Sequence, residues 1–275
     1  MLVSSHATIT ILCSLAVLVG ITIRLILILP ASRGPPPRRK HGLPTELMVV
    51  LGSGGHTAEM LYMLEDVDLT KFTRRSYIIS SGDSLSTIKV KEFEDKKERD
   101  MTQFSSRAAN AGQLSTLNGN ETSYTIAEGS KGFAVHIVPR ARLIHQSLWT
   151  SPFSAFRCLF ACFQLLIRKS YIQRKYPDLI LTNGPGTAVM VVGAVLLLRF
   201  LDFRGANKPN TMRIIYVESW ARIRTLSLTG RLLLPLVDRF IVQWKTLEAR
   251  GSKCEYHGAL VLGSCHYNRR PKIKR

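Results

Sequence analysis

The amino-acid sequence predicts an α/β fold, a doubly wound parallel sheet that follows one N-terminal transmembrane helix. Strand-like and helix-like segments alternate along residues 46–261, and the strand-like segments are nearly continuous apolar runs. Such runs are typical of parallel strands that helices cover on both faces of the sheet. The first run leads into the glycine-dense turn Gly52 to Gly55, as expected where a strand passes into a helix that can bind an anion.

The N-terminal segment, residues 1–30, predicts a membrane anchor. Residues Thr8 to Leu29 are mostly apolar, carry Arg24 as their only charge and are long enough to cross a bilayer as a helix. No lysine or arginine precedes this run and several follow it, so the rest of the chain should face the cytoplasm. Arg24 lies near the cytoplasmic end, where it can reach the interface, and we assign it no further role. Residues 31–45 are expected to form a basic, proline-rich linker.

The expected elements of the domain follow in order. The strands are predicted at Leu47–Leu51, Arg75–Ser80, Phe133–Val138, Asp178–Thr182, Met212–Val217 and Arg239–Trp244. The helices are predicted from His56 onward and at Lys89–Asp100, Pro152–Arg174, Ala188–Phe200 and Gly230–Val237. The apolar helix at 188–200 is too short to cross a bilayer alone, so we expect it inside the domain. Residues 101–132 contain few apolar residues and predict a mobile, disordered insertion.

The expected helix at 152–174 admits two interpretations. It has an apolar stripe at helical spacing, formed by Phe153, Phe156, Phe160, Phe163 and Ile167. The stripe can pack on the sheet, as in most amphipathic helices of globular domains. Alternatively, it can dip into the bilayer surface while the neighbouring arginines, Arg157 and Arg168, bind lipid headgroups.

The formal net charge of +19 favours an anionic partner. Nucleic acid is one such partner, but the chain has no recognisable nucleic-acid-binding module and is tethered to a membrane. An anionic membrane surface and a phosphorylated substrate explain the same charge. The five cysteines include no Cys-x-x-Cys pair, so we expect neither a zinc site nor a disulfide framework.

The glycine-dense turn is the main candidate for a ligand site. Its glycines let the backbone approach a ligand closely, and the helix that follows offers free N–H groups to a phosphate or diphosphate. His56 and Thr57 add side-chain donors at the mouth of this helix. The turn lacks the lysine of the Walker loop and the third glycine of the dinucleotide fingerprint, which excludes both motifs. A tight turn without a ligand remains the alternative.

Further candidate groups follow other strands and should meet this turn at the carboxyl edge of the sheet. They are Arg140, residues 183–187 and residues 218–222. Together these segments resemble one protein family, that of asparagine-linked glycosylation protein 14, over about residues 46–261. The motifs that carry the resemblance are Leu51–Thr57, Pro139–Arg142, Gln146–Trp149, Asn183–Thr187, Tyr216–Ser219, Arg224–Ser227 and Phe240–Trp244.

The resemblance implies the Rossmann-like, acceptor-side half of a GT-B glycosyltransferase, similar to the N-terminal half of the bacterial transferase MurG. It implies a two-subunit enzyme that transfers GlcNAc from UDP-GlcNAc to dolichyl-diphosphate-GlcNAc for protein N-glycosylation. The other subunit would be a soluble protein of the asparagine-linked glycosylation protein 13 family, which holds most of the UDP-GlcNAc. The expected location is the cytoplasmic face of the endoplasmic reticulum membrane and the contiguous nuclear membrane. The chain itself is expected to bind no cofactor and to be inactive alone.

The resemblance also implies roles for particular residues. His56 and Glu218 are the expected catalytic residues: His56 would contact a phosphate or position the acceptor hydroxyl, and Glu218 would orient or deprotonate that hydroxyl. Helix capping is the alternative for His56, and an ion pair with Arg222 or Arg224 is the alternative for Glu218. The residues expected to bind the acceptor diphosphate are Gly52, Ser53, Gly54, Gly55, Thr57, Arg140, Arg142, Asn183, Gly184 and Gly186.

The C-terminal segment is expected to contact the partner subunit. The resemblance assigns this role to Tyr256, Gly258, Leu260 and Val261, and a basic tail at 262–275 either weakens that docking or hangs free. Three other functions stay open at this level. They are a membrane scaffold without a chemical role, a self-sufficient enzyme on another phosphorylated substrate, and a nucleic-acid-binding protein.

Overall fold

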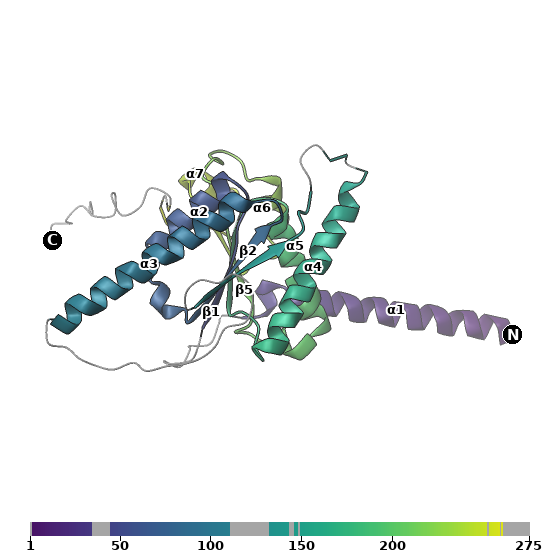
Figure 1. Ribbon diagram of the computed structural model, residues 1–275. Helices are drawn as coiled ribbons and strands as arrows, with labels where there is room; N and C mark the ends of the chain where they lie inside the picture. The colour runs from purple at the N-terminus through teal and green to yellow at the C-terminus, as the bar shows by residue number, and fades with distance from the viewer. Residues whose placement is uncertain are drawn as a thin grey trace, which may run out of the picture.

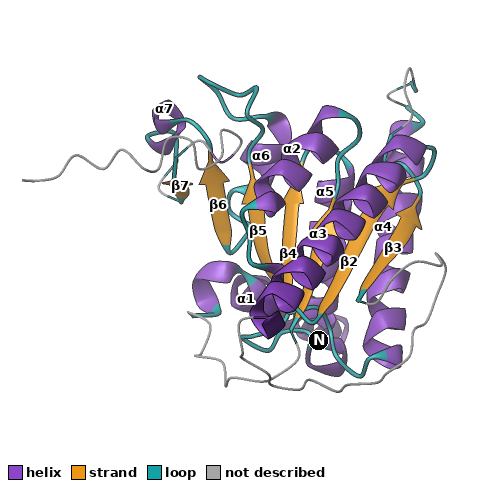
Figure 2. Ribbon diagram, turned by 60° about the vertical axis from the view of Figure 1, so that its left-hand side comes forward, coloured by secondary structure: helices purple, strands orange, loops and turns teal. Residues whose placement is uncertain are grey.

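The computed structural model describes residues 2–34, 45–110, 132–142, 146–147, 149–251, 253–258 and 260. The described residues form a seven-stranded parallel sheet in the order β3-β2-β1-β4-β5-β6-β7 (Figure 2). From β1 the chain adds strands outward on one side to β3, then returns to the other side of β1 and adds β4 to β7. This is a doubly wound sheet, so the predicted fold class is confirmed, and β1 and β4 flank the point where the strand order reverses.

The strands agree with the predicted ones to within two residues at each end, with one addition. They are β1 Glu46–Val50, β2 Arg74–Ser80, β3 Phe133–Val138, β4 Leu179–Asn183, β5 Arg213–Val217, β6 Arg239–Val242 and β7 Cys254–Tyr256. All five residues of β1 are buried, as its continuous apolar run requires. Strand β7 was not predicted, because a three-residue edge strand shows no periodicity.

Helices cover both faces of the sheet (Figures 1 and 2). The α-helices are α1 Leu2–Ile28, α2 Gly55–Glu65, α3 Ser84–Asn110, α4 Ser151–Ile172, α5 Thr187–Leu201, α6 Leu228–Leu233 and α7 Lys245–Glu248, and the single 3₁₀ turns are η1 Pro30–Ser32, η2 Leu69–Lys71 and η3 Phe203–Gly205. Alternate residues of β1 enter different cores: Leu47 and Val49 pack on the side of α2 and α3, whereas Met48 and Val50 pack on the side of α4 and α5.

The disordered insertion was predicted to begin at residue 101, which is earlier than the structure allows. Helix α3 continues to Asn110, so residues 101–110 are helical. Met101, Gln103, Arg107, Ala108 and Ala109 in this end of α3 are residues that favour a helix. The rest of the predicted insertion, residues 111–131, lies outside the described residues, as do linker residues 35–44, Val261 and the tail 262–275.

Helix α1 is long and apolar enough to cross a bilayer. Its residues Ile9–Ile28 have a mean hydropathy of 2.7 and are almost entirely exposed. Thr8 lies within the helix, and Leu29 follows its last residue. The helix projects from the side of the domain that α4 and α5 cover (Figure 1).

Arg24 has a structural role that the sequence analysis did not assign to it. Its guanidinium donates hydrogen bonds to the backbone oxygens of Arg199 and Phe200, both at 2.8 Å. These carbonyls lie at the end of α5, where the Asp202 N–H also donates to the Arg199 oxygen at 3.1 Å, and a cation there interacts favourably with the helix dipole. Arg24 therefore fixes the anchor helix to the C-terminal end of α5.

The start of the predicted linker is also part of the folded domain. Arg33 is buried, donates to the backbone oxygens of Lys208 and Thr211 at 2.5 and 2.8 Å, and lies 3.8 Å from the Asp238 carboxylate. Burial lowers the pKa of Arg33 and the nearby Asp238 partly offsets this. The segment that follows α1 is thus packed against the amino edge of the sheet.

Candidate functional site

The glycine-dense turn after β1 and the loop after β4 meet where the strand order reverses. Gly54 precedes α2 with φ +63°, and Gly186 precedes α5 with φ +24°. These left-handed conformations favour glycine. The N-termini of both helices consequently open at the same edge of the sheet, where doubly wound proteins bind ligands and where free N–H groups attract anions.

The two loops approach each other closely around His56. A Cβ atom on Gly52 would lie 2.7 Å from the His56 Cβ, and one on Gly184 would lie 3.2 Å from the Gly52 Cα. The Asn183 side-chain amide donates to the His56 backbone oxygen at 2.8 Å. The structure therefore brings together Gly52, His56, Asn183 and Gly184, which the sequence analysis had placed in one site.

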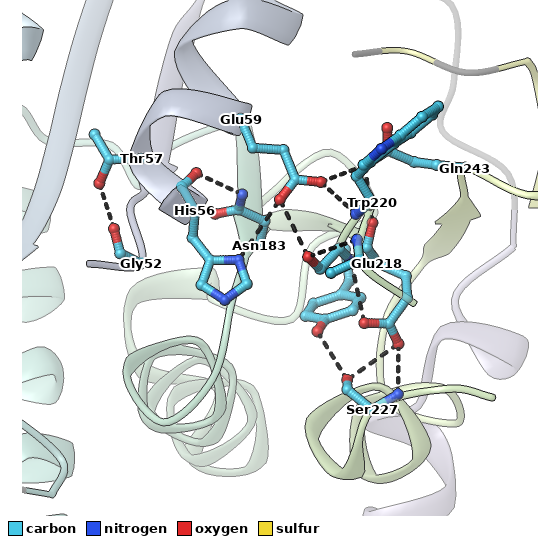
Figure 3. A network of polar contacts seen from close by, with 12 residues as sticks. Gly52, His56, Thr57, Glu59, Asn183, Glu218, Trp220, Ser227 and Gln243 are labelled. Carbon is cyan, nitrogen blue, oxygen red and sulfur yellow. Dashed lines mark hydrogen bonds and ion pairs between the residues drawn. The ribbon is translucent and has the colours of Figure 1, made fainter. Parts of the chain in front are cut away.

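His56 faces the carboxylate of Glu59, one helical turn farther along α2 (Figure 3). The His56 Nδ1 and Glu59 Oε2 atoms are 3.6 Å apart. The His56 side chain is 31% exposed and that of Glu59 only 9%. With Nδ1 turned to a carboxylate, Nε2 points away from Glu59.

Glu59 connects three segments of the site. Its carboxylate accepts hydrogen bonds from the Trp220 backbone N–H at 2.6 Å, the Gln243 amide at 2.5 Å and the Ser219 hydroxyl at 3.3 Å. Burial would raise the pKa of Glu59, but the nearby His56 ring and the hydrogen bonds from Trp220 and Gln243 outweigh burial and hold the pKa below its ordinary value. Glu59 is therefore ionised at neutral pH and fixes α2 to the loops that follow β5 and β6.

Glu59 was not among the functional residues predicted from the sequence. The available indication was its spacing of three residues from His56, which places both side chains on one face of a helix. Its other partners, Trp220 and Gln243, lie far away in the sequence and become neighbours only because β5 and β6 are adjacent strands.

Glu218 lies in a different environment from the predicted one. Its side chain points into the protein, and the residue is 1% exposed. It accepts hydrogen bonds from the Ser219 N–H at 3.1 Å and from the Ser227 N–H and hydroxyl, both at 3.0 Å. Ser227 in turn caps α6 by accepting from the Gly230 N–H at 2.8 Å. The carboxylate thus supports the start of α6 rather than facing a ligand, and the exposed Arg222 and Arg224 take no part in these bonds.

Thr57 also differs from its predicted role as a side-chain donor at the mouth of the helix. Its side chain is fully buried, its hydroxyl bonds to the Gly52 backbone oxygen, and it lies 2.6 Å from the Ser86 hydroxyl. This hydroxyl closes the glycine turn from inside. Ser53, Gly54 and Gly55 are exposed and offer their backbone to a ligand.

The two predicted arginines lie at the rim of the site and bind backbone oxygens. Arg140 donates to Ser81 at 2.8 Å and to Gly82 at 3.3 Å, whereas the exposed Arg142 donates to Gln146 at 3.1 Å. A Cβ on Gly186 would lie 3.2 Å from the Ala141 Cβ, so the Arg140 segment adjoins the loop after β4. Only Arg140 is held beside a turn at the carboxyl edge of the sheet.

Of the predicted partner-binding residues, Tyr256, Gly258 and Leu260 are described, and they lie in or just after β7, the edge strand opposite β3. Tyr256 ends β7 and is partly buried against the core, and Leu260 packs against the core on the α2 side. Gly258 has φ +93°, which favours glycine. Their role toward a partner stays a prediction. Among the described residues, no group of three or more His, Cys, Asp or Glu side chains could hold a metal ion.

The fold and site together define a class of protein, an α/β domain suited to bind a phosphorylated ligand at the carboxyl edge of its sheet. A doubly wound α/β domain presents two helix N-termini and an imidazole–carboxylate pair at its strand-reversal point, which suits a phosphorylated ligand and transfer of a proton. A helix that is long and apolar enough to cross a bilayer is fixed to the same domain.

The chain belongs to the Alg14 family. Residues 47–260 match the family described as "Oligosaccharide biosynthesis protein Alg14 like". The chain is similar to the UDP-N-acetylglucosamine transferase subunit ALG14 of Debaryomyces hansenii, at 38% identity over 88% of this chain and 91% of that protein. It is also similar to the subunit of the same name from Yarrowia lipolytica, at 37% identity over 90% and 95% of the two chains. A crystal structure of Acinetobacter baumannii MurG matches 73% of this chain and 41% of that one at 10% identity, with a TM-score of 0.40.

Proposed function

We propose that this chain is the membrane-anchored, acceptor-side subunit of a UDP-GlcNAc transferase that adds the second GlcNAc to dolichyl-diphosphate-GlcNAc. Family membership is the observation that carries the proposal, because relatives that align over nearly their whole length are named as subunits of a UDP-N-acetylglucosamine transferase. The arrangement of the site supports it as well. A diphosphate suits the exposed glycine turn and the two helix N-termini, and a lipid-linked substrate suits a domain fixed to a membrane helix.

His56 and Glu59 are the residues we propose for the proton transfer. The acceptor hydroxyl oxygen forms a bond to the anomeric carbon of GlcNAc, the bond from that carbon to UDP breaks, and the hydroxyl proton passes to His56 Nε2. Glu59 holds the imidazole by its Nδ1 side and stabilises the positive charge that develops on the ring. Glu218 takes no direct part, because its carboxylate is buried against the start of α6.

The chain supplies only one half of the enzyme in this proposal. The described domain is one doubly wound sheet, whereas a GT-B transferase needs two such domains, one of them for the sugar nucleotide. The second would be a soluble subunit of the asparagine-linked glycosylation protein 13 family, which holds UDP-GlcNAc. The location that fits is the cytoplasmic face of the endoplasmic reticulum membrane.

A reconstitution experiment tests this function. GlcNAc transfer from UDP-GlcNAc to a diphosphate-linked lipid GlcNAc acceptor is measured with membranes that contain this chain, the soluble subunit, or both. We expect activity only when both are present. Activity with this chain alone would contradict the split enzyme.

The same assay distinguishes a catalytic subunit from a scaffold. We expect His56→Ala to recruit the soluble subunit to membranes as the unchanged chain does, yet to lose most of the activity. A scaffold without a chemical role would retain full activity in this variant.

A further inference from the structure

The stripe of phenylalanines on α4 divides between the core and the surface. Phe163 and Ile167 are partly buried and pack against the core of the sheet. Phe153, Phe156 and Phe160 point outward and are 77, 66 and 52% exposed. Trp149, two residues before the helix, is 94% exposed. The N-terminal half of α4 therefore presents large apolar side chains to its surroundings, which is uncommon for a solvated helix.

The charges on α4 suit an anionic membrane surface. The helix contains no acidic residue. Two arginines of the helix are exposed: Arg157 directly follows Phe156, and Arg168 lies two turns beyond Phe160, and such long side chains can reach lipid phosphates. An apolar face with flanking cations is the pattern of helices that lie within the interface of a bilayer.

The anchor helix fixes the orientation of the domain and so identifies what covers this face. Arg24 joins α1 to the end of α5, and the segment after α1 is held by Arg33 and by a hydrogen bond from Arg213 to the Gly34 backbone oxygen at 2.7 Å. Helix α1 leaves the domain on the α4 and α5 side and runs transverse to α4 (Figure 1). Because α1 crosses the bilayer, α4 must run along the bilayer surface.

The apolar surface extends from α4 toward the anchor. Helix α5 packs along α4 and also contacts α1. Its residues Leu197 and Leu201 are 44 and 62% exposed, and Leu201 is adjacent to the carbonyls that Arg24 caps. The exposed side chains of α5 thus continue the surface that begins on α4 toward the point where α1 enters the membrane.

We propose that Phe153, Phe156 and Phe160 of α4 insert into the cytoplasmic leaflet beside the anchor, with Arg157 and Arg168 on lipid phosphates. The bilayer is the occupant that the geometry favours, because the fixed anchor holds α4 at the membrane surface.

The inserted helix also places the candidate site beside the lipid headgroups. The Ser154 hydroxyl donates to the Ala141 backbone oxygen at 3.0 Å, which ties the start of α4 to the rim of the site. This consequence rests on the proposed function: a diphosphate at the end of a lipid chain could then reach the glycine turn without leaving the membrane surface.

Lipid quenching of a fluorophore tests the insertion directly. The full chain carries an NBD label on Phe156→Cys in a Cys13→Ala and Cys265→Ser background, because Cys158, Cys162 and Cys254 are buried. It is reconstituted in phosphatidylcholine and phosphatidylserine vesicles with doxyl-labelled lipid.

The matched control carries the label on Leu85→Cys of α3, an exposed residue on the other face of the sheet. We expect a blue shift and quenching at position 156 but not at 85. If doxyl lipid does not quench the emission of the label at position 156, the proposal is wrong. This holds even if adding the soluble subunit changes that emission, because the helix would then bind the subunit and not the bilayer.

An activity assay tests the consequence separately. The variant F153E/F156E/F160E is compared with L85E/I88E on two acceptors, one with a long lipid chain in vesicles and one with a short, water-soluble chain. We expect the α4 variant to lose activity only on the long-chain acceptor and the α3 variant to lose neither. Equal activity of both variants on the long-chain acceptor would overturn the consequence. The quenching measurement does not require enzymatic activity. A failure of the insertion proposal can therefore be distinguished from a failure of the proposed transferase function.

Discussion

Glu59 is the residue through which the parts of the site hold one another in place. It faces His56 from within α2 and accepts hydrogen bonds from the loops after β5 and β6. Charge-assisted bonds of this kind are stronger than neutral ones and fix the orientation of the groups that they join. A carboxylate that orients an imidazole can therefore influence the reaction without contacting the substrate.

We expect Glu59→Gln to lower kcat of the reconstituted transferase by about ten- to a hundredfold, toward the lower end of what a positioned general base contributes. The amide keeps the volume of the side chain but loses the charge opposite His56 Nδ1. Because the pKa of Glu59 lies below its ordinary value, the carboxylate is ionised at neutral pH, and the substitution there removes a full charge. Steady-state kinetics should show a nearly unchanged KM for the acceptor.

The control is Glu65→Gln at the other end of α2. Glu65 forms an exposed ion pair with Lys96 at 2.9 Å and contacts no residue of the site. Its variant should retain wild-type kinetics. Equal kcat values for the two variants would eliminate the positioning role of Glu59.

Gly184 makes a second residue-scale prediction. With φ +80° and a Cβ position 3.2 Å from the Gly52 Cα, it cannot accept a side chain without strain. We expect Gly184→Ala to destabilise the domain by about 1–3 kcal/mol and to displace the His56 ring. Thermal unfolding in detergent and the transferase assay measure the two effects.

Gly193→Ala within α5 is the control, because its Cβ would meet only the flexible end of the Leu159 side chain. This variant should keep its transferase activity. Full activity in the Gly184 variant would contradict the close packing of the two loops.

At the residue scale, the sequence predicted which residues lie together at the site better than it predicted which groups their side chains contact. It placed Gly52, His56, Asn183 and Gly184 in one site because each follows a parallel strand, and the carboxyl ends of such strands share one edge. It did not predict that the side chains of Thr57 and Glu218 are directed inward, because the direction of a side chain depends on packing that no motif encodes. The hydroxyl of Thr57 and the carboxylate of Glu218 both point into the protein and satisfy backbone groups there.

At the scale of elements, Glu218 and α6 form one unit. The carboxylate accepts from the Ser227 N–H and hydroxyl, and Ser227 caps the helix. We expect Glu218→Gln to destabilise the domain by about 1–3 kcal/mol, because the amide nitrogen cannot accept either bond. The apparent Tm should fall by about 2–4 °C for each kcal/mol lost.

This prediction separates a structural carboxylate from a catalytic base. Any loss of activity in Glu218→Gln should follow the loss of folded protein and be recovered at lower temperature. A variant that unfolds at the wild-type temperature yet lacks activity would restore Glu218 to the catalytic role that the family resemblance implies.

The elements themselves were largely predictable from their residues. The apolar runs of β1 to β6 and the amphipathic spacing of α4 are strong local patterns, and the structure contains each of them. The end of α3 and the strand β7 were not predictable. Helix α3 continues to Asn110, beyond its densely charged part, and β7 pairs with β6 although its three residues form no periodic pattern.

At the scale of the whole molecule, the two faces of the sheet have different surroundings. The α2 and α3 face points away from α1, whereas the α4 and α5 face lies on the side from which α1 leaves (Figure 1). The sequence predicted both the anchor and the domain but not their rigid connection. Arg24 resembled an interfacial arginine and Arg33 a linker residue, because the carbonyls they bind lie more than 170 residues farther along the chain.

This connection should set the orientation of the domain on the membrane. In Arg24→Ala/Arg33→Ala, α1 still crosses the bilayer, because its apolar length is unchanged, but the hydrogen bonds to Arg199, Phe200, Lys208 and Thr211 are lost. We expect the variant to remain in the membrane fraction after carbonate extraction. We also expect weaker doxyl quenching of the NBD label at position 156 and lower activity on the long-chain acceptor.

The control Arg231→Ala/Arg250→Ala removes two exposed arginines of the same domain and should change neither readout. If the Arg24 and Arg33 variant kept wild-type quenching, insertion of α4 would not depend on the rigid anchor, and the anchor would act only as a tether.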